Sequence, residues 1–179
     1  HAGTSLHMDG GFTHVGTDES EIVLVLRHSM QDMIAATFRV LLESGASLGE
    51  PVTTIATPPE AQPRSVDTDY RPSPEVDLSA HLRIALGSVD ASECDAEGRM
   101  LPQKFIGAVS DGIRRLTSPL REIVVEHAVD KPERFGGAVL EFRIVHLDWP
   151  AAGDAFEVRS AFRRADGKTM ALEHWLADP

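Results

Sequence analysis

Two aspartates, Asp95 and Asp111, lie at the edges of one stretch of sequence, an acidic turn with a glycine followed by an apolar helix pattern. A carboxylate can attack a carbonyl carbon, or it can activate a water molecule for the same attack. Free N–H groups and partial positive charge at a helix N-terminus can stabilise the resulting oxyanion. This stretch therefore suggests acyl transfer, with Asp95 or Asp111 as base or nucleophile.

Gln103 is a third candidate, because its amide could orient a water molecule or a carbonyl group. Gln103, Gly107 and Asp111 are four residues apart, so they share one face of a helix. Glycine costs about 1 kcal/mol relative to alanine within a helix, and close approach by a ligand or a partner backbone would explain Gly107. Ordinary alternatives stay open: a turn-forming Asp95, a solvent-facing Asp111 and a polar residue at the helix start.

Composition narrows the possible partners. The chain has 179 residues and a net charge of −11, which argues against nucleic acid or an anionic membrane as the main partner. It has one cysteine, Cys94, no CxxC or HExxH motif and no run of 18 apolar residues. We therefore expect a cytoplasmic protein that binds no metal, nucleic acid or membrane.

The first 49 residues predict a small β arm. We interpret residues 1–8, which contain His7-Met8, as a remnant of a cloning tag. Asp9 to Ser20 is glycine-rich and polar and predicts a loop. Glu21 to Arg27 and Met33 to Glu43 show strand patterns, so residues 9–49 predict an N-terminal β-hairpin arm.

Residues 50–75 predict a linker, because proline at high density prevents both helix and central strand. Six of the 11 prolines lie there: Pro51, Pro58, Pro59, Pro63, Pro72 and Pro74. We therefore place a second domain at residues 76–179.

The second domain predicts an α+β fold. His81 to Val89 reads as a strand, and Pro102 to Leu116 reads as a helix that Ser118-Pro119 ends. Four strand patterns follow the helix: Arg121 to Val129, Gly137 to Leu147, Asp154 to Arg164 and Thr169 to Ala177. This order predicts an antiparallel sheet wrapped around one long helix.

This order of elements, with an Asp-x-x-Gly turn before the helix, resembles the hotdog fold. More narrowly, it resembles the group of 4-hydroxybenzoyl-CoA and acyl-CoA thioesterases. The matching residues are Cys94-Asp95-Ala96-Glu97-Gly98, followed by Phe105 ten positions after Asp95. The run from Gly153-Asp154 to Glu173-His174 is similar to the closing hairpin of such domains, and residues 21–43 are similar to that of a second, partial hotdog.

The resemblance implies hydrolysis of an acyl-CoA or acyl-carrier thioester, with coenzyme A as part of the substrate and no separate cofactor. It also implies a homodimer or a higher homo-oligomer. One branch of the group carries its catalytic carboxylate at the position of Asp95, and others carry theirs on the helix, at the spacing of Asp111. Arg99 and Arg134 are candidates for binding the phosphates of coenzyme A.

The turn also departs from the group. Arg99 stands where many members have histidine, and Leu101-Pro102 replaces a common asparagine pair. The alternatives to hydrolysis are therefore an acyl-binding protein without turnover and a structural dimerisation module.

Overall fold

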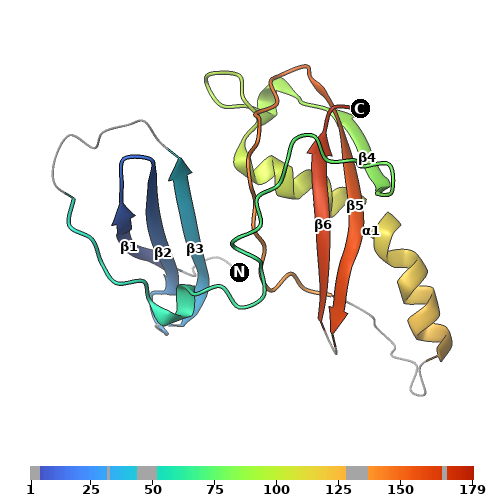
Figure 1. Cartoon of the computed structure of the whole chain (residues 1–179). Coiled ribbons are helices and arrows are strands. Elements are labelled where there is room, and N and C mark those ends of the chain that lie inside the picture. Colours follow the sequence, from blue (N-terminus) through green and yellow to red (C-terminus); the bar gives the residue numbers. More distant parts are fainter. Residues whose placement is uncertain (1–4, 32, 44–51, 128–136, 167–168) are drawn as a thin grey trace. The chain divides into compact units, whose positions relative to one another are not determined.

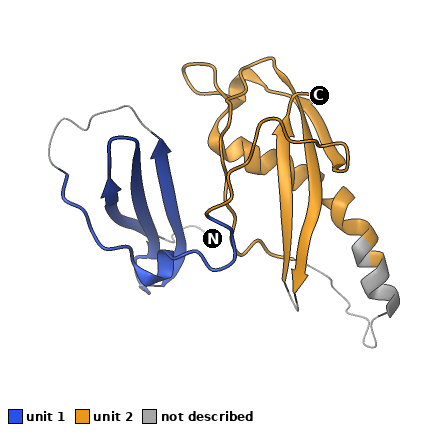
Figure 2. Cartoon of the chain, viewed as in Figure 1, with its two compact units in different colours: residues 1–68 blue, residues 69–179 orange. Residues whose placement is uncertain are grey.

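The computed structural model describes residues 5–31, 33–43, 52–127, 137–166 and 169–179. The chain divides into two compact units, His1–Thr68 and Asp69–Pro179 (Figure 2). Each unit contains a three-stranded antiparallel sheet, and the second unit also contains one long helix (Figure 1). The predicted α+β class is therefore confirmed. No helix in the described ranges combines the length and apolar character that crossing a membrane requires.

The first unit contains strands β1 (Leu6–Val15), β2 (Glu19–His28) and β3 (Ile34–Glu43), in the order β1-β2-β3. The predicted hairpin is confirmed as β2 and β3. The prediction of a loop at Asp9 to Ser20 is wrong, because most of this stretch forms β1. A Cβ atom on Gly10 would lie 2.1 Å from the carbonyl oxygen of Val23, so the backbones come close where the glycines stand. Glycine here marks close strand approach rather than a loop.

Part of the proline-rich stretch folds onto this sheet. A short 3-10 helix, Pro59–Ala61, places Ala61 in a buried cluster with Val23 and Val25. The Ile55 N–H donates to the carbonyl oxygen of Phe12 at 2.7 Å. Proline prevents regular structure here, but it leaves an extended chain that covers one face of the sheet.

The second unit contains strands β4 (Leu82–Ser88), β5 (Ala155–Asp166) and β6 (Thr169–Ala177), in the order β4-β5-β6. The corresponding three strand predictions are confirmed. Helix α1 (Pro102–His127) packs on β4 and β5 through a core of Ile84, Leu116 and Val158. A Cβ atom on Gly112 would lie 2.8 Å from the carbonyl oxygen of Ile84, so this glycine lets α1 approach β4.

The prediction that Ser118-Pro119 ends the helix is wrong. Helix α1 continues to His127 with Pro119 inside it, so the predicted strand from Arg121 is wrong as well, and residues 128 and 129 lie outside the described ranges. Proline removes only one donor from the helix, and the remaining ladder continues beyond it. The Thr117 hydroxyl donates to the Ile113 carbonyl oxygen at 3.2 Å, just before the proline.

The predicted strand from Gly137 to Leu147 is also wrong. Residues 137–146 have no regular structure and pair with none of the described strands. Val139 and Leu140 are largely exposed, and Arg143 donates to the carbonyl oxygen of Tyr70 at 2.6 Å. β-propensity alone does not create a ladder, because it reflects packing against cross-strand neighbours, and this stretch has none among the described strands.

Candidate functional site

The loop between β4 and α1 is held by side chains that bond to their own backbone. Its short 3-10 helix, Ala91–Glu93, begins at Asp90, whose Oδ1 accepts from the Ser92 N–H at 2.7 Å and the Ser92 hydroxyl at 2.6 Å. Cys94 and Met100 then pair as an antiparallel bridge. The backbone between this pair forms the tight turn that carries Asp95.

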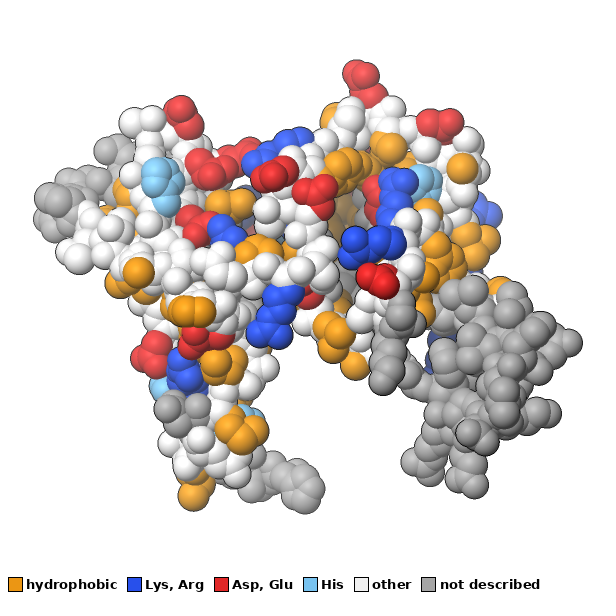
Figure 3. Space-filling model, turned by 60° about the horizontal axis from the view of Figure 1, so that its bottom comes forward, with side chains coloured by type: hydrophobic (Ala, Val, Ile, Leu, Met, Phe, Trp, Pro, Cys, Tyr) orange, Lys and Arg blue, Asp and Glu red, His pale blue; other side chains and the backbone are white. Residues whose placement is uncertain are grey.

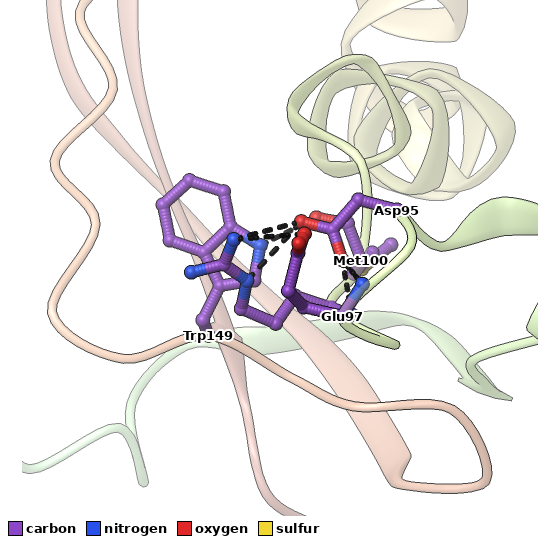
Figure 4. A network of polar contacts seen from close by, with 5 residues as sticks. Asp95, Glu97, Met100 and Trp149 are labelled. Carbon is purple, nitrogen blue, oxygen red and sulfur yellow. Dashed lines mark hydrogen bonds and ion pairs between the residues drawn. The ribbon is translucent and has the colours of Figure 1, made fainter.

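Asp95 is the centre of that turn (Figure 4). Its Oδ1 accepts from the N–H groups of Glu97 at 3.0 Å and Arg99 at 2.8 Å, as in an Asx-turn. Its Oδ2 lies 3.1 Å from both Nε and Nη2 of Arg99. Gly98 has φ of +79°, a conformation that favours glycine. Both carboxylate oxygens therefore serve the turn itself.

This environment favours the ionised form of Asp95. The Arg99 N–H bond is the main cause that lowers the pKa of the Asp95 carboxyl, and the guanidinium charge of Arg99 adds to it. A carboxylate with a lowered pKa is a weaker base. The structure thus gives Asp95 a structural role in its turn. A turn-forming Asp95 was the alternative to a catalytic Asp95 in the sequence analysis.

An aromatic cluster fixes the end of the same loop. The Trp149 indole donates to the Met100 carbonyl oxygen at 2.5 Å (Figure 4), and the Met100 N–H donates to the Pro150 carbonyl oxygen at 2.8 Å. His146 stacks on Trp149 with ring centroids 4.3 Å apart and meets the edge of Phe105 at 4.8 Å. Burial lowers the pKa of the His146 imidazole. The cluster joins residues 146–150 to the start of α1.

The helix start is tied to the loop by two further contacts. The Leu101 N–H donates to the Glu93 carbonyl oxygen at 2.8 Å, and Lys104 Nζ lies 2.8 Å from Glu93 Oε1. Glu93 raises the pKa of the Lys104 ammonium. The first turn of α1 is therefore held in one position relative to the Asp95 turn.

Asp111 has different surroundings from those of Asp95. It lies in the middle of α1 and is exposed, as is Gln103 two turns earlier. Between them, a Cβ atom on Gly107 would meet no atom of the described residues within 4 Å, apart from its own stretch of helix backbone. We call the strip formed by Gln103, Gly107 and Asp111 the open face of α1. It lies away from Gly112, where the helix touches β4.

The predicted site residues that the structure describes lie in two separate places, the Asp95 turn and the open face of α1. Asp95 and Arg99 form one cluster with Glu97, since Arg99 Nη2 also lies 3.4 Å from the Glu97 carboxylate. Asp111 and Gln103 belong to the open face and form no hydrogen bond or ion pair with that cluster. Arg134 lies outside the described residues. Arg99 is half exposed but already paired with two carboxylates, so a phosphate would have to compete with them.

A buried polar pair escaped the sequence analysis. Ser160 and His174 are directly opposite on β5 and β6, and Ser160 Oγ lies 2.7 Å from His174 Nδ1. Ser160 is only 1% exposed, and burial lowers the pKa of His174. Their pairing depends on the strand register, which the spacing along the chain does not reveal. A serine so deeply buried cannot reach a substrate, so we assign the pair to the core.

A second polar cluster occupies the other face of the same sheet. His81 Nε2 lies 3.7 Å from Glu173 Oε2, and Arg163 forms an ion pair with the same carboxylate. Among the described residues, neither ring nitrogen of His81 has a hydrogen-bond partner, although the side chain is only 8% exposed. Within the described residues, no group of three or more His, Cys, Asp or Glu side chains could hold a metal ion.

Comparisons with protein-family models, with curated proteins and with solved structures gave no match to this chain.

Proposed function

We propose that this protein hydrolyses an acyl-CoA-type thioester on the open face of α1, with Asp111 as general base. The observation that carries the proposal is the unfilled space at Gly107, which lies between two exposed polar side chains of matching helical spacing. A glycine inside a helix costs stability, and none of the described residues packs against Gly107. Room for a substrate at the backbone accounts for it.

Asp111 suits the chemistry better than Asp95. A general base must offer an oxygen lone pair to a water molecule within hydrogen-bond reach. Both oxygens of Asp95 already accept bonds from Arg99, and one also accepts from Glu97. Asp111 is exposed on the open face and is not committed to a turn.

The spacing on the open face allows one thioester to contact both polar residues. Gln103 and Asp111 are about 12 Å apart along the helix axis, with Gly107 about 6 Å from each, at about 1.5 Å per residue. A thioester carbonyl placed over Gly107 could direct its oxygen towards the Gln103 amide. The opposite side of the carbonyl carbon would then face a water molecule held by Asp111.

The proposed reaction runs in two steps. Asp111 accepts a proton as the water oxygen attacks the carbonyl carbon, and the Gln103 N–H donates to the oxyanion. The oxyanion then collapses, the C–S bond breaks, and the proton on Asp111 passes to the departing thiolate. The products are a carboxylic acid and a free thiol. The backbone N–H of Gln103 lies about 6 Å along the axis from Gly107, beyond hydrogen-bond reach of a carbonyl placed there, so the longer Gln103 side chain supplies the donor.

The hotdog arrangement is part of this proposal. It is supported by α1 packing on one face of an antiparallel sheet, and by a loop held by Asp95 and Gly98 directly before the helix. Arg99, half exposed at this loop, and Arg134 are the proposed contacts for the phosphates of coenzyme A.

Release of free thiol from a panel of acyl-CoA substrates tests the proposal. Asp111→Asn should lower kcat by about 100-fold to 10,000-fold, the usual contribution of a general base. Gln103→Ala should lower kcat by about 100-fold, as expected for the loss of one oxyanion donor. Glu122→Gln is the matched control, since Glu122 is another exposed carboxylate on the same helix.

Two results would reject the assignment: no thiol release by the wild-type protein from any substrate, or full activity in Asp111→Asn. Binding of acyl-CoA without turnover would instead support the acyl-binding alternative. Both carboxylate oxygens of Asp95 are used by its turn. If Asp111 proves not to be catalytic, acyl-CoA binding without turnover is therefore favoured over hydrolysis with Asp95 as the catalyst.

A further inference from the structure

An exposed arginine, Arg114, lies in line with the open face of α1. It comes seven residues after Gly107, so it is about 10 Å further along the helix axis and only about 20° away around it. Ser110 and Asp111 stand on either side of the line that joins these two positions, because they are three and four residues after Gly107. The helix surface between Gly107 and Arg114 is therefore not crossed by a side chain of α1.

Arg114 has no partner among the described residues, unlike several other arginines of the second unit. Those arginines pair with carboxylates: Arg83 and Arg159 with Glu157, Arg99 with Asp95, and Arg163 with Glu173. Basic and acidic side chains are likewise interspersed on the face drawn in Figure 3. Arg114 takes part in no described ion pair or hydrogen bond, although Asp111 precedes it at a helical spacing that allows one.

The place of Arg114 in the helix removes another ordinary explanation for a basic residue. A basic side chain in the last turn of a helix interacts favourably with the helix macrodipole, and this effect falls off within that turn. Because α1 continues to His127, Arg114 lies in its middle, about three turns before its end. Lys104, the other basic side chain in this half of α1, is already paired with Glu93 at 2.8 Å.

An unpaired guanidinium is well suited to bind a carboxylate. It presents parallel N–H groups that match the two carboxylate oxygens, and it stays charged at any physiological pH. Arg114 therefore offers an anion contact in line with the proposed position of the thioester carbonyl, over Gly107.

The position of this contact relates it to the acyl arm of the substrate. The coenzyme A arm of the proposed thioester runs towards Arg99, directly before the helix, where its phosphates are proposed to bind. The acyl arm then leaves Gly107 towards the C-terminal half of α1 and follows the line to Arg114. Helix side chains lean towards the helix N-terminus, so the Arg114 guanidinium reaches back over part of the gap of about 10 Å.

We propose that the acyl group is dicarboxylic, with its terminal carboxylate bound by Arg114 while its thioester carbonyl lies over Gly107. This inference rests on the proposed function, because it assumes hydrolysis at Asp111. It adds the chemical class of the acyl group and assigns the residue that selects it.

Two pairs of substrates test the inference: glutaryl-CoA against pentanoyl-CoA, and adipyl-CoA against hexanoyl-CoA. The members of each pair have acyl chains of equal length and differ in the terminal carboxylate. Thiol release by the wild-type protein, corrected for release without protein, should give a kcat/KM at least about 10-fold higher for the dicarboxylic member of at least one pair. The difference should lie mainly in KM, because the carboxylate is remote from the reacting carbon and is bound equally in the ground and transition states.

Arg114→Gln should abolish this preference, and Arg114→Lys should restore part of it, because lysine keeps the charge without the planar guanidinium. Arg115→Gln is the matched control. It removes the same charge from a neighbouring exposed position, but Arg115 is about 80° around the helix from Gly107. This variant should keep the preference of the wild type.

Equal kcat/KM values within both pairs, for an active wild-type protein, would overturn the inference and leave the proposed hydrolysis standing. An equal loss of preference in Arg114→Gln and Arg115→Gln would overturn it as well, because net charge would then account for the preference. No thiol release from any of these substrates would reject the hydrolysis on which the inference rests, and the inference with it.

Discussion

The turn at Asp95 and the open face at Asp111 use the same side chain in opposite surroundings. At the turn, one carboxylate oxygen accepts from two backbone N–H groups, and the other pairs with the Arg99 guanidinium. On the open face, Asp111 is exposed, and a Cβ atom added at Gly107 would meet no described residue outside its own helix turn within 4 Å. One carboxylate is committed to structure and the other is not.

This difference shows that candidate residues of the same type can be ranked by their hydrogen-bond partners. A carboxylate whose lone pairs are all used by its own loop stabilises that loop and has little capacity left for a substrate. The hydrogen-bond partners of each aspartate therefore discriminate between the two candidates better than their spacing in the sequence does.

The two glycines of α1 give the largest expected effect on stability. Gly112→Val should destabilise the second unit by about 3 kcal/mol, because the added side chain meets the backbone of Ile84. Gly107→Ala should stabilise it by about 1 kcal/mol, because alanine favours the helix and the space is open. Urea unfolding measures both. A similar loss in the free energy of unfolding for both variants would show that the space at Gly107 is occupied.

Trp149→Phe tests whether the loop beside Asp95 is held by the aromatic cluster. Phenylalanine preserves the contact with His146 but leaves the Met100 carbonyl without its indole donor. We expect a loss of about 1–2 kcal/mol in the free energy of unfolding. His146→Phe, which keeps an aromatic ring beside Trp149, is the comparison variant. An unchanged unfolding curve for Trp149→Phe would contradict the assigned role of the indole.

Stability should also fall in mild acid, and this effect is the smallest. Burial lowers the pKa of His174 in the folded state, so the unfolded chain takes up a proton first as pH falls below about 6.5. The free energy of unfolding is thus highest above that pH and decreases towards the lower folded pKa.

Thermal unfolding at pH 7.5 and pH 5.5 measures this change. His174→Gln, which can still bond to Ser160, should lose less stability between the two values than the wild type does. An identical loss would assign the acid sensitivity to other groups, with His146, whose pKa is also lowered, as the next candidate.

Much of the fold could be predicted from local patterns. Local strand patterns in the sequence predicted β2, β3, β5 and β6. The wrong predictions of strands and loops arose where tertiary contacts decide which structure a stretch adopts. Glycines that favour a loop in isolation stand in β1, and a β-prone stretch before Leu147 pairs with none of the described strands.

The site could be predicted only in part. The helical spacing placed Gln103, Gly107 and Asp111 on one face, and the structure leaves that face open. The choice between Asp95 and Asp111 required hydrogen bonds that no spacing reveals. The pairing of Ser160 with His174 required the register of β5 and β6, which a bulge between Phe162 and Arg164 sets.

We propose separate roles for Asp95 and Asp111, and a crossed measurement on two variants tests this proposal. Each of Asp95→Ala and Asp111→Asn is measured for Tm and for kcat against the best acyl-CoA substrate. We predict that Asp95→Ala lowers Tm and retains most of kcat at a temperature where it is folded. We predict that Asp111→Asn keeps the wild-type Tm and loses at least about 100-fold in kcat. The reverse pattern, with kcat lost in Asp95→Ala and retained in Asp111→Asn, would contradict the account.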